Sequence, residues 1–232
     1  MAYLSIVSLV GINYLFAISE QSMNKYGYYF MVITVSVLTI THFLNNRKVD
    51  FFLERLYFIL KLILIHSALN FFAYFLFKGD LVNISSPWSG TEYGHFNYLF
   101  YFSTKELGVI NLYGIEFARN HGLFWEPGIL QLYLNILFFL EAFIFQKSRL
   151  LLLAIAFVIL TTYSTTGIGI LLLLSVVYVF REQKKRKYLI PLLLSACIPV
   201  YIIFSLNVEE KISGDRENSF QKRLFDLTQP FF

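Results

Sequence analysis

Charged residues and cysteine are scarce in this chain. Of its 232 residues, 15% are charged and 57% are hydrophobic, whereas about a quarter of the residues in a soluble domain are charged. This scarcity excludes an ordinary soluble domain and indicates an integral membrane protein. The single cysteine, Cys197, excludes an internal disulfide and a cysteine-based metal site. The formal charge of +4 needs no nucleic acid to explain it, and we expect no nucleic-acid partner.

What the sequence has in place of charge is a series of apolar segments. A membrane-spanning helix needs about 20 mostly apolar residues. We identify seven candidate spans: 3–18, 26–44, 56–77, 127–146, 150–163, 164–180 and 188–206. The fifth and sixth are short and meet at Ser164–Gly167, so they form either a tight hairpin or one long broken helix. The sequence therefore predicts an all-α, polytopic transmembrane helical bundle, with residues 1–232 forming one integral membrane domain.

Lysine and arginine are concentrated in three of the loops between the predicted spans. Ten lie in loops 45–55, 147–149 and 181–187, which total 21 residues, and eight lie in loops 19–25, 78–126 and 207–232, which total 82 residues. Cytoplasmic loops carry the excess of basic residues, so the N-terminus is predicted to be cytoplasmic and loops 78–126 and 207–232 to face outward. A broken helix over 150–180 would put two basic loops on opposite sides, so the pattern favours the hairpin. The Lys184–Lys187 run is interpreted as an orientation signal, with anionic-lipid binding as the alternative.

The large outward loop 78–126 has three parts. Residues 83–94 contain turn-forming residues, residues 95–102 are rich in aromatic side chains typical of a lipid–water interface, and residues 107–118 are expected to include a short helix. The first apolar segment lacks a basic leader and a cleavage site, so it is interpreted as a retained span. The chain stops at Phe232 where a new apolar stretch begins, and we expect it to be a fragment of a longer protein or a truncated gene product.

Polar residues inside the apolar segments gather toward the predicted outer side. They are His66 and Asn70, Gln131 and Asn135, each pair on one helix face, and Thr161, Thr162, Ser164, Thr165 and Thr166. Glu141 is the exception, near the inner end of the fourth span. Such residues either join packed helices by hydrogen bonds or line a water-filled cavity; an ionisable group such as His66 is more often functional. The outward bias favours a cavity that opens outward.

The segment Arg119–Gly128, RNHGLFWEPG, concentrates ionisable groups where this loop meets the fourth span. Arg119 can bind phosphate oxygens in a bidentate manner; the alternative is a salt bridge to Glu116 or Glu126. His121 can carry a proton or only hydrogen-bond. Glu126 precedes Pro127, which fits a first helical turn, and can simply complement the helix dipole. Trp125 is either an interfacial anchor or a sugar platform.

A second basic cluster lies in the outward tail, at Arg216, Lys222 and Arg223. Residues 219–227 have apolar side chains at helical spacing, which indicates a basic amphipathic helix on the outer surface; the alternative is a solvated juxtamembrane helix. Two separated arginine sites around a polar cavity predict a clamp for pyrophosphate, and no metal site is predicted.

Three stretches resemble the O-antigen polymerases, which join oligosaccharide repeat units of bacterial surface polysaccharides. They are ARNHGLFWEPGILQLYLNI (118–136), TTYSTTGIGILLL (161–173) and SFQKRL (219–224). The resemblance implies a membrane fold of the glycosyltransferase C type and polymerisation of undecaprenyl-pyrophosphate-linked repeat units into O-antigen, as in lipopolysaccharide, or capsule. It implies the bacterial plasma membrane, no cofactor, and a chain-length regulator and a flippase as partners. Family members have ten or more spans, so further spans and site residues are expected after Phe232.

By resemblance, Arg119 and Arg223 contact the pyrophosphate, and Glu126 or His121 activates the acceptor hydroxyl. The expected substrate-binding residues are Arg216, Lys222, Trp125, His66 and Gln131. Two other classes stay open. A ligase-like transferase would use almost the same chemistry with another acceptor. A transporter or flippase would carry polar residues through the full depth of the bundle, and the outward bias argues against it.

Overall fold

Helices dominate the computed structural model, which describes residues 2–16, 23–85, 92–103, 109–112, 115–124, 126–181, 201 and 205. The chain divides into two compact units, Met1–Leu56 and Tyr57–Phe232. The long helix α3 (Val49–Phe77) begins in the first unit and continues into the second. Each unit is described separately below.

The first unit contains a pair of apolar helices, α1 (Ala2–Phe16) and α2 (Met23–Asn45). They run antiparallel, because Tyr3 Oη lies 2.9 Å from Thr34 Oγ1 at one end and the Tyr14 and Tyr26 rings meet at 5.0 Å at the other. Most apolar side chains of α2 are exposed, as expected for a helix whose solvent is lipid rather than water.

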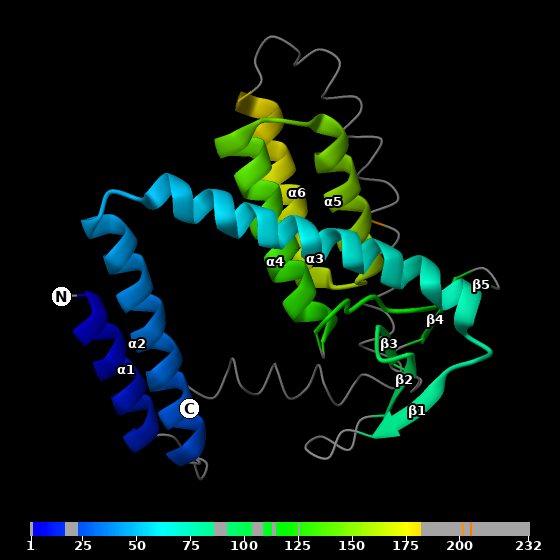
Figure 1. Ribbon diagram of the computed structural model, residues 1–232, viewed down its shortest axis with the longest axis horizontal. Coiled ribbons are helices and arrows are strands. Elements are labelled where there is room, and N and C mark those ends of the chain that lie inside the picture. Colours follow the sequence, from blue (N-terminus) through cyan, green and yellow to red (C-terminus); the bar gives the residue numbers. More distant parts are fainter. Residues whose placement is uncertain are drawn as a thin grey trace. The chain divides into compact units, whose positions relative to one another are not determined.

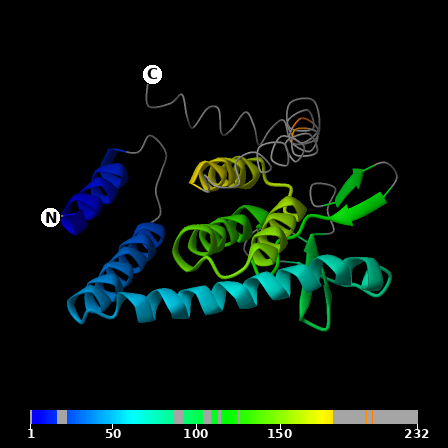
Figure 2. The same cartoon turned by 90° about the horizontal axis from the view of Figure 1, so that it is seen from above.

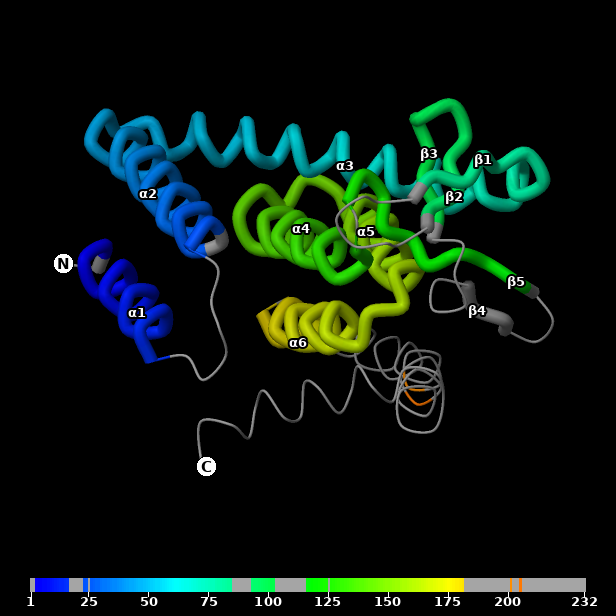
Figure 3. Tube along the Cα trace, turned by 90° about the horizontal axis from the view of Figure 1, so that it is seen from below, coloured from blue at the N-terminus to red at the C-terminus, as the bar shows by residue number. Residues whose placement is uncertain are grey.

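The second unit packs the rest of α3 against three helices. These are α4 (Pro127–Phe139), α5 (Arg149–Thr161) and α6 (Thr165–Arg181). Figure 1 shows α3 running across α4 and α5, and Figures 2 and 3 show α4 and α5 between α3 and α6. The buried face of α3 repeats every three or four residues: Tyr57, Leu60, Leu64, Ser67, Asn70 and Ala73. That spacing is one stripe of an α-helix, so α3 buries one face and leaves the rest exposed.

The fifth and sixth apolar segments form the predicted hairpin. Helix α5 ends at Thr161, Tyr163 takes a left-handed conformation (φ +53°), and α6 starts at Thr165. Arg181 Nη1, at the end of α6, donates to the carbonyl oxygen of Phe143 at 3.2 Å. Because Phe143 lies a few residues before α5 begins, the chain has reversed between α5 and α6.

Helix α4 begins and ends as its sequence indicates. Glu126 is extended (φ −143°, ψ 135°) and Pro127 occupies the first turn, where its missing N–H is not needed. After Phe139 the helix widens into one π-helical stretch, Leu140–Phe145, which ends at the left-handed Gln146 (φ +52°). Ser148 then caps α5, since its hydroxyl accepts from Leu151 N at 3.3 Å.

Two small antiparallel sheets correct the all-α expectation for the loop between α3 and α4. Strands β1 (Val82–Ser85), β2 (Glu92–Phe96) and β3 (Phe100–Ser103) form one sheet in that order, and β4 (Val109–Leu112) pairs with β5 (Ile115–Ala118). The short helix expected in 107–118 is therefore wrong. The physical reason is that the β-branched residues of this segment, Val109, Ile110 and Ile115, favour strand over helix.

A small apolar cluster attaches this β region to the end of α3. Ala73, Phe102 and Ala118 are buried together, with Tyr74, Phe77, Leu81 and Phe100 packed around them. The Phe77 and Phe96 rings stack with their centroids 3.9 Å apart. The loop is thus a folded layer over one end of the helices.

The membrane prediction is supported in its coarse form. Within the part of the chain that the structure describes, three helices are long and apolar enough to cross a bilayer: Tyr26–Asn45, Val49–Phe77 and Pro127–Phe145. Helices α1, α5 and α6 are apolar but have 15, 13 and 17 residues, which is shorter than the ~20 that a span requires. The seventh predicted span, 188–206, lies almost wholly outside the described residues.

Candidate functional site

Asn120 is the centre of a buried polar cluster at the junction of α3, α5 and the loop. Its Nδ2 donates to Ser67 O at 2.8 Å and to Thr161 Oγ1 at 3.0 Å. Its Oδ1 accepts from Asn70 Nδ2 at 3.3 Å and from Gly122 N at 3.1 Å. These four bonds use the full capacity of the amide, and Asn120 N also donates to Thr161 O at 3.0 Å. Asn120 therefore fixes the loop to two helices at once.

Arg119 is held at the C-terminal end of α5. Its Nε donates to Thr162 O at 3.3 Å and its Nη2 to Tyr163 O at 3.2 Å. Helix carbonyls at this end lack intrahelical partners, and a basic side chain satisfies them well. The half-buried guanidinium is thus oriented by backbone groups of the turn between α5 and α6.

His121 and Gly122 form a tight buried turn next to these residues. His121 Nδ1 donates to the carbonyl oxygen of Phe124, and Phe124 N donates to His121 O at 3.0 Å. Because a carbonyl oxygen only accepts, Nδ1 carries the proton and Nε2 is an acceptor. The pKa of His121 is lowered to about 4, mainly by burial; the hydrogen bond to Phe124 opposes this shift and the nearby Arg119 adds to it. His121 is therefore neutral at pH 7.

Only glycine fits at position 122, because of its backbone conformation and because of the close approach of α3. Its φ is +56°, and a Cβ added there would lie 2.5 Å from Ser67 Oγ. A side chain at this position would collide with α3, so the loop can approach the helix this closely only through glycine.

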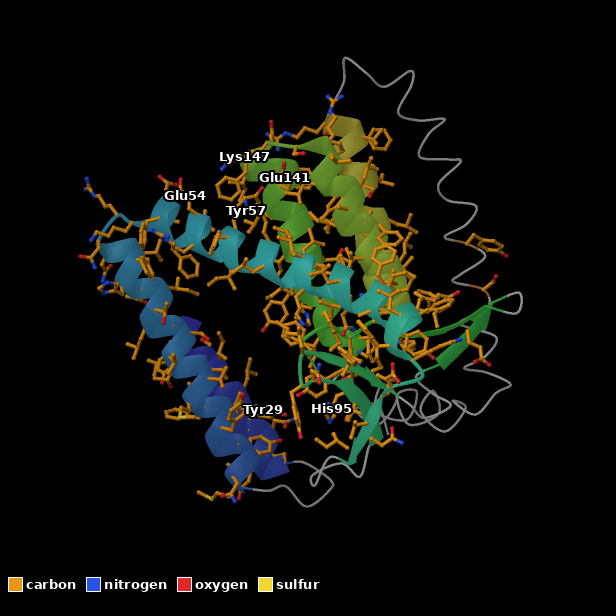
Figure 4. All side chains as sticks on the ribbon, turned by 45° about the vertical axis from the view of Figure 1, so that its right-hand side comes forward. Tyr29, Glu54, Tyr57, His95, Glu141 and Lys147 are labelled. Carbon is orange, nitrogen blue, oxygen red and sulfur yellow. The ribbon has the colours of Figure 1, made fainter. Side chains whose placement is uncertain are left out.

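His66 and Asn70, predicted to share a face, attach the β2–β3 hairpin to α3. His66 Nε2 donates to Leu99 O at 3.0 Å. Asn70 exchanges two bonds with the Tyr101 backbone, donating to its O at 3.3 Å and accepting from its N at 3.2 Å. The hairpin turn is further held by His95, a buried residue of β2 at the lower side in Figure 4, whose Nδ1 accepts from Tyr98 N at 3.3 Å.

Gln131 and Asn135 lie where α4 meets α6. Gln131 Nε2 donates to Gly128 O at 2.9 Å, and Asn135 Nδ2 donates to Gln131 Oε1 at 3.0 Å and Gly167 O at 3.2 Å. A Cβ on Gly167 would lie 2.7 Å from Gln131 Cβ. Both amides serve helix packing here, which was the alternative interpretation of these residues; a substrate contact by Gln131 stays a prediction.

The other predicted site residues divide into two groups. Glu126 lies within the described residues. It is exposed at the N-cap of α4, and its side chain makes no capping hydrogen bond. Trp125, Arg216, Lys222 and Arg223 lie outside the described residues, as does the amphipathic segment 219–227. The structure places Arg119 and His121 beside polar residues of α3 and α5, among them Asn70 and Thr161. That this end of the unit faces outward stays a prediction.

Four buried polar atoms of this end have no hydrogen-bond partner among the described residues. They are His66 Nδ1, Ser67 Oγ, His121 Nε2 and Asn135 Oδ1. Buried polar groups are normally satisfied by protein, water or ligand. All four can accept a hydrogen bond from a hydroxyl group, and Ser67 can also donate one.

Asn120 is the residue that sequence reasoning missed. It lies between the ionisable residues Arg119 and His121, and an asparagine in a loop most often marks a turn. Only its position between α3 and α5 reveals its role. No group of three or more His, Cys, Asp or Glu able to hold a metal occurs in the part of the chain that the structure describes. No protein-family model, curated protein or solved structure matches the chain.

Proposed function

We propose that this chain is a membrane-embedded glycosyltransferase that polymerises lipid-pyrophosphate-linked oligosaccharide repeat units at the outer face of a bacterial plasma membrane. In this proposal the acceptor sugar hydroxyl attacks the anomeric carbon of the donor glycan. The new C–O bond forms as the bond to the lipid pyrophosphate breaks, the leaving group takes the electron pair, and the hydroxyl proton passes to a base. The seven-span arrangement and the glycosyltransferase C type of fold belong to the same proposal.

The observation that supports it most is the fixed position of Arg119 and His121. Asn120, between them, is bonded to α3 and α5 through its whole side-chain amide. A phosphate leaving group is best stabilised by donors that are oriented before the reaction, and guanidinium is suited to phosphate oxygens. Held by two backbone carbonyls, Arg119 has the preorganisation that this role requires.

His121 and Glu126 take different parts in the proposed reaction. A group with a pKa of about 4 is a weak base at neutral pH. His121 Nε2 therefore accepts a hydrogen bond from the acceptor hydroxyl and orients it, and the exposed Glu126 receives the proton. Arg223, in the outward tail, is the proposed second pyrophosphate contact.

The test is the length distribution of surface glycan in cells that carry variants of this chain. Arg119→Ala and Arg119→Lys should both leave single repeat units, because lysine is a point charge without the planar fork. Lys78→Ala removes an exposed cation of the same loop and should leave long chains. Long glycans in both Arg119 variants would reject the proposal. If lost glycan merely follows lost protein or a lower Tm, Arg119 acts only as a cap on α5.

A further inference from the structure

The end of the second unit opposite the Asn120 cluster contains two lysines on one tyrosine ring. Lys61 Nζ lies 4.7 Å from the centroid of the Tyr57 ring and Lys147 Nζ lies 5.4 Å from it. Lys147 Nζ is also 4.9 Å from the centroid of the Phe145 ring. The two ammonium groups are therefore at most about 10 Å apart, close enough for one anion to be shared after small side-chain movements.

The tyrosine platform is fixed by a buried carboxylate. Tyr57 Oη donates to Glu141 Oε2 at 2.6 Å, and Ser148 N donates to Glu141 Oε1. Figure 4 shows Tyr57, Glu141 and Lys147 side by side at this end. Both carboxylate oxygens of Glu141 are hydrogen-bonded, one to Tyr57 and one to Ser148. Glu141 lies in the π-helical stretch, so its carboxylate fixes the Tyr57 ring against this part of the helix.

The local backbone directs Lys147 onto these rings. The π-helical stretch ends at Gln146, whose left-handed conformation (φ +52°) turns the chain sharply. Lys147 follows immediately and lies back over Phe145 and Tyr57. This turn separates α4 from α5, and Lys147 is exposed while Lys61 is half-buried.

Among the described residues, neither ammonium group has a carboxylate within ion-pair distance; the ring faces are their contacts. With Glu141 included, the cluster has a net positive charge. Two like charges near one ring repel each other, and an anion between them removes that repulsion and gains charge-assisted hydrogen bonds. Basic side chains beside membrane helices attract anionic lipid head groups, and aromatic rings are enriched at the membrane–water interface.

We infer that Lys61, Lys147 and the Tyr57 ring bind the phosphodiester head group of an anionic glycerophospholipid. The head-group phosphate takes both ammonium groups, and the acyl chains lie along the exposed apolar side chains near this end, among them Phe58, Leu62 and Ile144. This site is independent of the proposed glycosyl transfer and requires only that this end of α3 and α4 meets a membrane surface.

The experiment measures lipid retention by the full chain in detergent, using native mass spectrometry with phosphatidylglycerol added. The double variant Lys61→Gln/Lys147→Gln should retain phosphatidylglycerol about 25-fold less tightly than the unaltered chain, since each cation near a lipid surface contributes about a factor of five. Lys48→Gln/Lys78→Gln removes the same charge from exposed positions of other loops and should retain the lipid as the unaltered chain does. Equal retention in the two double variants would overturn the inference.

Further measurements distinguish binding of an anionic lipid from binding of any lipid or of free phosphate, and from a loss of folding. Phosphatidylcholine should show no difference between the variants, and glycerol 3-phosphate should not compete, because the site takes a lipid rather than free phosphate. If the glutamine variant fails to fold, Lys61→Arg/Lys147→Arg keeps both charges and should keep the lipid. Raising the salt concentration should then release phosphatidylglycerol from the unaltered chain; lipid that stays bound at high salt would also overturn the inference.

Discussion

The side-chain amide of Asn120 donates to the backbone carbonyl of Ser67 at 2.8 Å, and so ties the loop before α4 to the middle of α3. The same nitrogen donates to Thr161 Oγ1 in α5. One short side chain thereby connects three parts of the chain that are distant in sequence. The positions of Arg119 and His121 on either side depend on this connection.

Replacing Asn120 should destabilise the second unit strongly. Asn120→Ala leaves Ser67 O, Gly122 N and Asn70 Nδ2 without this partner, and one buried polar group left unsatisfied costs about 1–3 kcal/mol. We expect a total loss of roughly 3 kcal/mol or more, measured as Tm in detergent. Asn83→Ala, at an exposed position of β1, serves as the control and should change Tm little. A loss no larger than that of the control would contradict the arrangement.

The two glycines of the RNHGLFWEPG segment should respond differently to alanine. Gly122→Ala places a methyl group 2.5 Å from Ser67 Oγ at φ +56° and should cost about 2 kcal/mol. Gly128→Ala, inside the first turn of α4, meets only the Glu126 side chain, whose nearest atom is Oε1 at 3.6 Å. It should be neutral or stabilising by up to about 1 kcal/mol. Similar Tm changes for both variants would mean that Gly122 does not approach α3 so closely.

The pKa of His121 predicts a loss of stability in mild acid. Its pKa is about 4 in the folded chain and about 6.5 when unfolded, so the unfolded chain binds more protons between these values. Stability should be complete above pH ~6.5 and fall as pH decreases toward ~4, by on the order of 3 kcal/mol. The measurement is Tm between pH 7 and 4.5. His121→Asn should flatten the dependence and His42→Asn, at an exposed position, should not; a slope unchanged in His121→Asn would refute the assignment.

Tyr57→Phe should loosen the opposite end of the same unit. The change keeps the ring and removes the hydroxyl that donates to Glu141 Oε2 at 2.6 Å. A hydrogen bond to a charged group contributes about 1.5–3 kcal/mol, and Tm should fall accordingly. Tyr98→Phe, at an exposed turn position, provides the comparison. Combining Tyr57→Phe with Glu141→Leu should restore part of the lost Tm, because the double variant has no buried carboxylate that lacks its hydrogen-bond donor.

Helix positions could be predicted from the sequence because they follow from local patterns. The end of the apolar run at 77, Pro127 and the polar turn at Ser164 mark boundaries that the structure reproduces within a few residues. Helix α3, however, begins at Val49, seven residues before the predicted start at 56. The basic loops correctly favoured the hairpin of α5 and α6. The strands of the β region were missed because each is four or five residues long and depends on pairing with residues distant in sequence.

The site could be predicted only in part for a similar reason. Arg119 and His121 stand out as ionisable residues in an apolar chain, and the structure brings them together. Asn120, Ser67 and the Tyr57–Glu141 pair depend on contacts between residues 53 and 84 positions apart, and no local pattern reveals such contacts. The amides of Gln131 and Asn135 were visible in the sequence, but only their bonds at Gly167 show that they join helices.

The central claim is that Arg119 stabilises a lipid-pyrophosphate leaving group during glycan polymerisation. The most direct measurement uses the purified full chain in lipid vesicles with a lipid-pyrophosphate-linked repeat unit, and follows product length on a gel together with the release of lipid pyrophosphate. We expect a ladder of products with stoichiometric release, and a rate reduced roughly a hundredfold or more in Arg119→Ala at unchanged Tm. A ladder formed at the same rate by the folded Arg119→Ala variant, or no product from the unaltered chain, would contradict the claim.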